Sequence, residues 1–370
     1  MTTVAEQPTS QRAVPPARWC LGTRLLVTAT LAWAALLLVH ALVSGRWWLW
    51  LVVELAPPVV VLVVPVVLLA LTPLAARPVR LPLAVVLAAT LVLGVPLSGL
   101  SLPGAAAGAV PGAVKVFSWN TGYWHQGEDP AAFYSYLRAQ HADVYLLQEY
   151  LYFSDDPIRI DDLPRIRREF PGYHVAAASE LVTISRLPIA ASRPVDASAL
   201  MSPADGSAPP AGTDWRDYYT TKALRTDIRV GGDLVSFYNV HLAVQVDIRL
   251  SPFSAAFYRV IHDQYHRREA ELRTLSADLS ANGNPAVIAG DFNSTSLMAD
   301  VRRVCERSRC HDPSGPSPLP LSWPTEGMPR LWRLDWVLSQ GGLDVTGYHF
   351  TPSKGMSDHL AQSLSVSVAR

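Results

Sequence analysis

The chain has 370 residues, equal numbers of basic and acidic side chains, and a hydrophobic content of 49%. This length allows about two domains. Residues 1–110 contain six arginines, no lysine and only two acidic residues, whereas residues 111–370 have a net charge of 25 − 29 = −4. Proteins that bind duplex DNA use a surplus of Lys and Arg to neutralise phosphates, so the composition argues against nucleic acid as the partner.

Three apolar runs in the first hundred residues are each long enough to cross a bilayer, because about 20 helical residues span its hydrocarbon core. The predicted segments are a disordered tail over residues 1–24, membrane spans over about 25–43, 47–71 and 81–100, a linker over 101–113 and a soluble domain over 114–370. A cleaved signal peptide is the alternative for the first run, but three successive runs favour a multi-pass membrane protein.

The arginines of the N-terminal part predict its orientation in the cell membrane. Three precede the first run, one follows it, two lie between the second and third runs, and none follows the third. The positive-inside rule then puts the N-terminus in the cytoplasm and the soluble domain outside it. In such a compartment Cys305 and Cys310 predict a local disulfide. Glu54, inside the second run, is either a functional intramembrane carboxylate or a residue at headgroup depth.

Short apolar or alternating runs predict the strands of the soluble part. They are residues 114–119, 143–147, 173–178, 181–185, 223–230, 234–240, 287–290, 334–338, 345–350 and 361–368. Helices are predicted from Pro130, after the N-cap Asp129, and over residues 257–279. Residues 190–217, rich in Pro, Ala and Ser, predict a surface loop. Many strands with few helices predict an α/β (α+β) fold of packed sheets flanked by helices.

Polar side chains stand at or near the ends of six of these segments. They are Asn120, Glu149, His241, Asp291, Asn293, Asp335, Asp358 and His359. Buried strands seldom carry charged side chains unless these are paired or bind a metal. If the strands share one sheet edge, we expect these residues to converge on a single site.

The residue types favour hydrolysis of a phosphoester with a hard cation. Glu149, aided by Asn120, is predicted to hold Mg²⁺ or Mn²⁺, which prefer oxygen ligands. Such a metal neutralises a phosphate oxygen and stabilises the leaving oxyanion. We expect Asp291 to orient or deprotonate the attacking water, and Asn293 to bind a phosphoryl oxygen.

Two histidines complete the predicted site. His359 is expected to stabilise the charge on the pentacovalent phosphorus, with Asp335 or Asp358 holding its other ring nitrogen. His241 is expected to donate a hydrogen bond to a phosphate oxygen. Asp358 is also a predicted metal ligand. Lys222 is a further cation that either contacts phosphate or stays solvated at the surface.

Seven motifs in this order resemble those of the endonuclease/exonuclease/phosphatase superfamily. They are Ser118-Trp119-Asn120, Leu147-Gln148-Glu149, Ser185-Arg186-Leu187-Pro188-Ile189, Asn239-Val240-His241, Gly290-Asp291-Phe292-Asn293, Leu334-Asp335-Trp336 and Ser357-Asp358-His359. The resemblance covers about residues 114–368. It implies a four-layered α/β sandwich, phosphoester hydrolysis dependent on a divalent metal, and the roles given above at the matching residues.

The superfamily resemblance leaves the substrate open, because its members cleave DNA, inositol phosphates, sphingomyelin and other phosphoesters. Three apolar runs followed by this domain resemble the actinobacterial membrane proteins linked to teicoplanin resistance (the VanJ type). That resemblance implies a phosphorylated lipid, a polyprenyl pyrophosphate of cell-wall synthesis, as substrate. The alternatives are a surface nuclease, a sphingomyelinase-like phosphodiesterase, and a membrane-anchored binding module with an inactive phosphoesterase fold.

Overall fold

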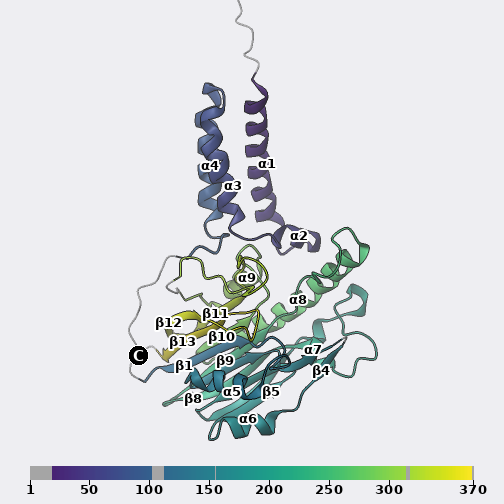
Figure 1. Cartoon of the computed structure of the whole chain (residues 1–370), viewed down its shortest axis with the longest axis vertical. Coiled ribbons are helices and arrows are strands. Elements are labelled where there is room, and N and C mark those ends of the chain that lie inside the picture. Colours follow the sequence, from purple (N-terminus) through teal and green to yellow (C-terminus); the bar gives the residue numbers. More distant parts are fainter. Residues whose placement is uncertain (1–18, 102–111, 155, 314–316, 369–370) are drawn as a thin grey trace, which may run out of the picture.

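The computed structural model describes residues 19–101, 112–154, 156–313 and 317–368 (Figure 1). The predicted tail and linker lie largely outside these residues. The helices are α1 (Leu21–Val43), α2 (Leu51–Glu54), α3 (Val60–Leu71), α4 (Arg77–Gly94), α5 (Pro130–Ala139), α6 (Leu163–Glu169), α7 (Arg216–Thr220), α8 (Ala255–Ala281) and α9 (Asp300–Ser308), with the 3-10 turns η1 (Trp48–Trp50), η2 (Thr72–Leu74), η3 (Ser198–Leu200) and η4 (Pro203–Asp205).

The strands form two large sheets and one small one. They are β1 (Val114–Asn120), β2 (Val144–Gln148), β3 (Leu151–Phe153), β4 (Pro157–Arg159), β5 (His174–Ala178), β6 (Leu181–Ser185), β7 (Ile189–Asp196), β8 (Thr221–Val230), β9 (Asp233–His241), β10 (Ala286–Asp291), β11 (Asp335–Gln340), β12 (Leu343–Thr351) and β13 (Ala361–Val368). The six-stranded sheet has the order β12-β13-β1-β2-β6-β5, the five-stranded sheet β11-β10-β9-β8-β7, and β3 pairs with β4. Each large sheet contains one parallel pair, β1–β2 or β9–β10.

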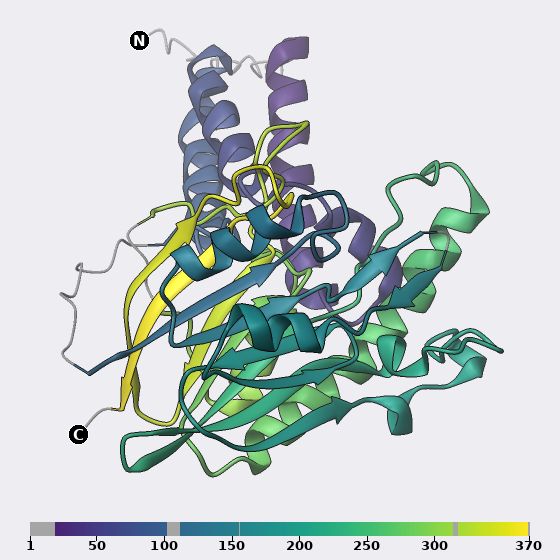
Figure 2. The ribbon, with the colours of Figure 1, turned by 60° about the horizontal axis from the view of Figure 1, so that its bottom comes forward.

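Three buried clusters of apolar side chains separate four layers. The cluster between the two sheets includes Val116, Leu146 and Phe237. A second, aromatic cluster lies between the six-stranded sheet and helices α5 and α6, and a third lies between the five-stranded sheet and helices α8 and α9. Figure 2 shows α5 and α6 in front of the sheets and α8 behind them. The predicted arrangement of packed sheets with outer helices is therefore confirmed.

The predicted surface loop over residues 190–217 is wrong in its first part. Strand β7 occupies residues 189–196 and pairs with β8 at the edge of the five-stranded sheet. Most of its side chains are exposed, and it contains Pro194, which an edge strand tolerates because one side of its backbone needs no partner. Because β7 is a solvated edge strand, its residue composition resembles that of a surface loop, which explains the wrong prediction.

Helices α1, α3 and α4 stand together on one side of the sheets (Figure 1). By length and composition α1 and α4 could each cross a membrane, and residues 60–74 form a shorter apolar helix. The predicted second run, residues 47–71, is divided between α2 and α3 on either side of Pro57 and Pro58. Proline lacks the N–H that a helix interior needs. Three complete spans therefore remain a prediction.

The apolar helices and their connections contact the sheet domain directly. The carbonyl oxygen of Gly45 accepts a hydrogen bond from the hydroxyl of Tyr265 at 3.1 Å. The Trp332 indole N–H donates to the carbonyl oxygen of Leu55 at 3.1 Å. The Ser296 hydroxyl donates to the carbonyl oxygen of Leu97, which lies just after the end of α4, at 2.8 Å. The apolar helices are thus docked on the domain at several points.

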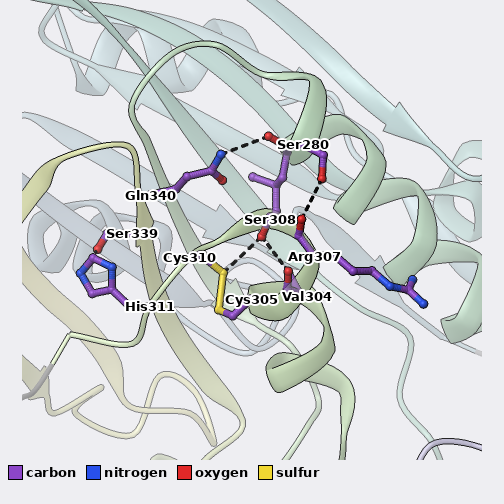
Figure 3. The surroundings of a disulfide bond; sticks show 10 residues. Ser280, Val304, Cys305, Arg307, Ser308, Cys310, His311, Ser339 and Gln340 are labelled. Carbon is purple, nitrogen blue, oxygen red and sulfur yellow. Dashed lines mark hydrogen bonds between the residues drawn. A yellow bond between two sulfur atoms is a disulfide. The ribbon is translucent and has the colours of Figure 1, made fainter.

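A disulfide joins Cys305, near the end of α9, to Cys310, as the sequence predicts (Figure 3). Arg309, with a φ of +58°, turns the chain back at the end of the helix. His311 then exchanges two backbone hydrogen bonds with Ser339 of β11, both at 2.9 Å. The disulfide lies directly between the end of α9 and this bridge, so it helps to fasten the helix to the edge of the five-stranded sheet.

Candidate active site

Strand β10 brings three of the predicted residues into one row. Asp291 lies opposite His241 of β9 and opposite Asp335 of β11. The preceding Gly290 has a φ of +146°, and a Cβ there would lie 1.9 Å from the carbonyl oxygen of Val240. Only glycine allows this close approach between the parallel strands. The glycine therefore fixes the row in which the three polar side chains meet.

The six-stranded sheet supplies Asn120 and Glu149 to the same place. Asn120 ends β1, and its Nδ2 donates to Oε1 of Glu149 at 3.2 Å and to Oδ2 of Asp291 at 3.0 Å. Below this point Gln148 Nε2 donates to Oδ1 of Asn239 at 2.6 Å. Because Gln148 belongs to one sheet and Asn239 to the other, these buried amides tie the two halves of the site together.

His359 is held by Asp335 and faces Asp291. Its Nδ1 lies 2.9 Å from Oδ2 of Asp335, and its Nε2 lies 3.6 Å from Oδ2 of Asp291. Burial alone would lower the pKa of His359, but Asp335 and then Asp291 raise that pKa well above its ordinary value. Of the two predicted alternatives for the partner of the ring, the structure brings Asp335, and not Asp358, to Nδ1.

His241 has a partner that the sequence analysis missed. Its Nδ1 lies 3.2 Å from Oε1 of Glu180, and its Nε2 lies 3.8 Å from Oδ2 of Asp291. The ammonium group of Lys222 donates to the same oxygen of Glu180. It also lies 4.0 Å from the ring centroid of Tyr218. Lys222 is therefore neither solvated nor free to contact phosphate, but is buried as part of an ion-pair network.

The charges of this network shift the acidities of its members. Burial alone would raise the pKa of Glu180, but His241 and Lys222 lower it to about 2. Burial alone would lower the pKa of His241, but Glu180 raises it to about 8. At neutral pH the pair is thus a carboxylate that holds a protonated imidazole, with Nε2 of that imidazole directed at Asp291.

Asn293 and Asp358 occupy different places around this centre. The backbone N–H of Asn293 donates to Oδ1 of Asp291 at 2.7 Å, and its side-chain Nδ2 donates to the carbonyl oxygen of Leu242 at 2.9 Å. Asp358 is exposed, and its Oδ2 accepts a hydrogen bond of 2.8 Å from the indole N–H of Trp323. Asn293 therefore orients Asp291, whereas Asp358 stands at the rim.

Glu149 has the surroundings expected of a ligand to a divalent cation. Its Oε2 accepts the backbone N–H of Tyr123 at 2.8 Å, and burial raises the pKa of Glu149. A bound cation would favour the ionised form of such a carboxylate. Asn120 turns its Nδ2 toward the carboxylates while its Oδ1 accepts the N–H of Gly122 at 3.1 Å. Its amide oxygen thus faces the backbone, and its role as a metal ligand stays a prediction.

A second group of potential ligand atoms lies beside Glu149. Oxygen or nitrogen atoms of Asp291, Asp335 and His359 all lie within 4.8 Å of one another. Carboxylates and imidazole suit divalent transition metals as well as an ion pair. The donor atoms of the whole site, carboxylate oxygens from both sheets with two imidazoles, therefore fit a divalent cation.

Comparison with family models identifies the family of this chain. A family model described as "Endonuclease/Exonuclease/phosphatase family" matches residues 117–359. No curated protein matches the chain. Matching solved structures include a family protein from Leptotrichia buccalis, at 16% identity over 69% of this chain and 100% of that chain, with a TM-score of 0.47. They also include sphingomyelinase C from Streptomyces griseocarneus, at 17% identity over 70% of this chain and 99% of that chain, with a TM-score of 0.45.

Proposed function

Because the chain belongs to the endonuclease/exonuclease/phosphatase family, we propose that it is a phosphoester hydrolase that depends on a divalent metal. The observation that supports this most is the set of groups around Oδ2 of Asp291. Asn120 Nδ2 lies 3.0 Å from this oxygen, His359 Nε2 3.6 Å and His241 Nε2 3.8 Å. Two imidazoles and an amide around one carboxylate oxygen suit the binding of a phosphate group and an attacking water.

Each residue has a role that follows from its position. Glu149, with Asn120 and Asp358 as the other predicted ligands, would hold Mg²⁺ or Mn²⁺. That metal, when bound, neutralises a phosphate oxygen and stabilises the leaving oxyanion. Asp291 orients the attacking water and accepts its proton, because the backbone N–H of Asn293 fixes its other oxygen.

The two histidines supply positive charge to the phosphate. Asp335 keeps the proton on Nδ1 of His359, so that Nε2 can donate to a phosphoryl oxygen as charge develops on it. Glu180 does the same for His241 from the opposite side. Asn293 is proposed to contact a phosphoryl oxygen as well, once a substrate displaces its hydrogen bond to the backbone of Leu242.

We further propose that the substrate is a lipid-linked phosphate or pyrophosphate in the membrane that holds α1 and α4. Both helices are apolar enough to span a bilayer, and α2, which connects α1 to α3, lies on the side where the domain is docked. The soluble part has a net charge of 25 − 29 = −4, which disfavours DNA. In more detail, we propose that the domain is extracytoplasmic and acts on the polyprenyl carrier of cell-wall synthesis. Through this carrier it would contribute to glycopeptide resistance.

A substrate panel tests the proposal. Purified full-length protein in detergent is incubated with Mg²⁺ or Mn²⁺ and with a polyprenyl pyrophosphate, sphingomyelin or plasmid DNA. We expect inorganic phosphate from the polyprenyl substrate and loss of that activity in Glu149→Ala and His359→Ala. Nicking of DNA, or cleavage of sphingomyelin, without phosphate release from the prenyl substrate would instead favour a nuclease or a phosphodiesterase. Inertness toward all three would favour a binding module.

A further inference from the structure

The loop that follows the catalytic strand β9 carries side chains that are unusually exposed for their type. Residues 242–254 connect His241 to the start of α8. Within this loop Phe253 is 97% exposed, Ile248 is 75% exposed and Val244 is 48% exposed. Single exposed apolar residues are common on soluble proteins, but three in one short loop next to a site form a patch that calls for a partner. We refer to Val244, Ile248 and Phe253 as the apolar lip.

The opposite side of the same loop packs on the membrane anchor. Val246 and Leu250 contact a buried cluster that contains Leu51 of α2 and Phe257 and Ile261 of α8. Trp48, Val52 and Leu55 pack against this cluster from the anchor side. The loop is therefore fixed to α2 by one set of apolar side chains, while the lip faces away from the domain.

The start of the loop is fixed to the active site. The carbonyl oxygen of Leu242 accepts the side-chain amide of Asn293, and the backbone N–H of Ala243 donates to Oε2 of Glu271 at 3.0 Å. Val244 is thus only three residues from His241. The apolar lip begins at the edge of the phosphate site and continues toward the anchor.

The position of the loop relative to the apolar helices indicates what covers the lip. In Figure 1 the loop at the beginning of α8 rises beside α2, to the level at which α1 and α4 meet the domain. Three tryptophans directly precede α2: Trp48 packs on the same cluster as Val246 and Leu250, and Trp47 is 49% exposed. Tryptophan at the end of an apolar span is typical of the membrane–water interface. A bilayer that surrounds α1 and α4 would therefore reach the lip.

We propose that the apolar lip inserts into the headgroup region of the bilayer that holds α1 and α4, and that it guides a lipid-borne phosphate to His241. The proposal rests on the proposed membrane-anchored function and deepens it, because it names the path of the substrate. The only charged residues of the loop over residues 242–254, Asp247 and Arg249, pair with each other at 2.8 Å. This pairing lowers the cost of bringing the loop to the interface.

A fluorescent label at the lip tests insertion without reference to activity. In full-length Cys20→Ser protein, which lacks the exposed free thiol, Phe253→Cys is labelled with nitrobenzoxadiazole and reconstituted into phosphatidylcholine/phosphatidylglycerol vesicles. We expect a blue-shifted emission that nitroxide-bearing lipids quench. Ile158→Cys, on β4 and 51% exposed, is the matched control and should remain unquenched. Equal quenching at the two positions, or none at Phe253, would overturn the proposal. An absence of quenching at Phe253 is also the result expected if a second copy of the chain, and not the bilayer, covers the lip.

A second variant tests the path of the substrate. Ile248→Ser combined with Phe253→Ser should raise the KM for a polyprenyl pyrophosphate in vesicles by roughly tenfold or more. The kcat/KM for water-soluble geranyl pyrophosphate should change less than twofold. Equal losses on both substrates would contradict a role in lipid delivery. Quenching at Phe253 in a protein that releases no phosphate from lipids would contradict the proposed function but would still support insertion of the lip into the bilayer.

Discussion

Glu180→Gln removes one buried charge and keeps the shape of the side chain, so its effect can be worked out from the structure. The pKa of Glu180 is lowered from 4.5 to about 2 by His241 and Lys222. A shift of this size corresponds to about 3 kcal/mol of stability at neutral pH. Because the folded pKa is depressed, this stabilisation is present above pH 4.5 and is lost as the pH falls toward 2. The free energy of unfolding of the parent should thus exceed that of the variant by roughly 3 kcal/mol at pH 5 and by roughly 1 kcal/mol at pH 3.

Thermal unfolding of the detergent-solubilised protein, followed by tryptophan fluorescence from pH 7 to pH 3, measures this difference. For a domain of this size about 3 kcal/mol corresponds to a Tm difference of roughly 6–12 °C. Asp217→Asn is the control, because its partner Arg159 and Asp217 itself are 55% and 42% exposed and such pairs contribute little. A Tm difference that is absent at pH 7, or that is as large at pH 3 as at pH 7, would refute the assigned charge network.

Three further substitutions test other parts of the site. Gly290→Ala should lower the Tm by roughly 6 °C or more, because a Cβ would meet backbone atoms at a cost of roughly 3 kcal/mol. The control Gly283→Ala, which has open space around its Cβ, should leave the Tm nearly unchanged. Equal Tm changes in the two variants would contradict the close approach at Gly290. Asp335→Asn should lower kcat by roughly 100-fold or more with little change in KM, because His359 loses the carboxylate that holds its proton; an unchanged kcat would contradict this role. Trp323→Phe should raise the metal concentration needed for half-maximal activity, because Asp358 loses its hydrogen-bond donor; an unchanged metal dependence would argue against Asp358 as a ligand.

The strands and the site edge could be predicted because both depend on local sequence. Runs such as Val287-Ile288-Ala289 are apolar throughout and become β10, which is buried along its whole length. Polar residues directly after such runs must lie at a strand end. Strand β7 could not be predicted in this way, since its exposed side chains give it the composition of a loop.

The partner of His241 could not be predicted because it comes from a distant segment. Glu180 precedes β6 in a turn, where a charged residue normally is solvated, and only the packing of the two sheets brings it to His241 and Lys222. The one local signal was Lys222 itself, a charge directly before the predicted strand over residues 223–230. The sequence also could not predict which apolar side chains of residues 242–254 are buried and which are exposed, because that depends on where α2 packs against the loop.

The most direct test of the proposed mechanism is the metal dependence of phosphate release in the parent and in Glu149→Gln. Full-length protein in vesicles containing a polyprenyl pyrophosphate is freed of metal with a chelator and then titrated with Mg²⁺. We predict that the parent is inactive without metal and recovers with Mg²⁺, and that Glu149→Gln needs at least tenfold more Mg²⁺ or stays inactive. Phosphate release by the chelated parent, or identical titrations for both proteins, would contradict a Glu149-centred metal site.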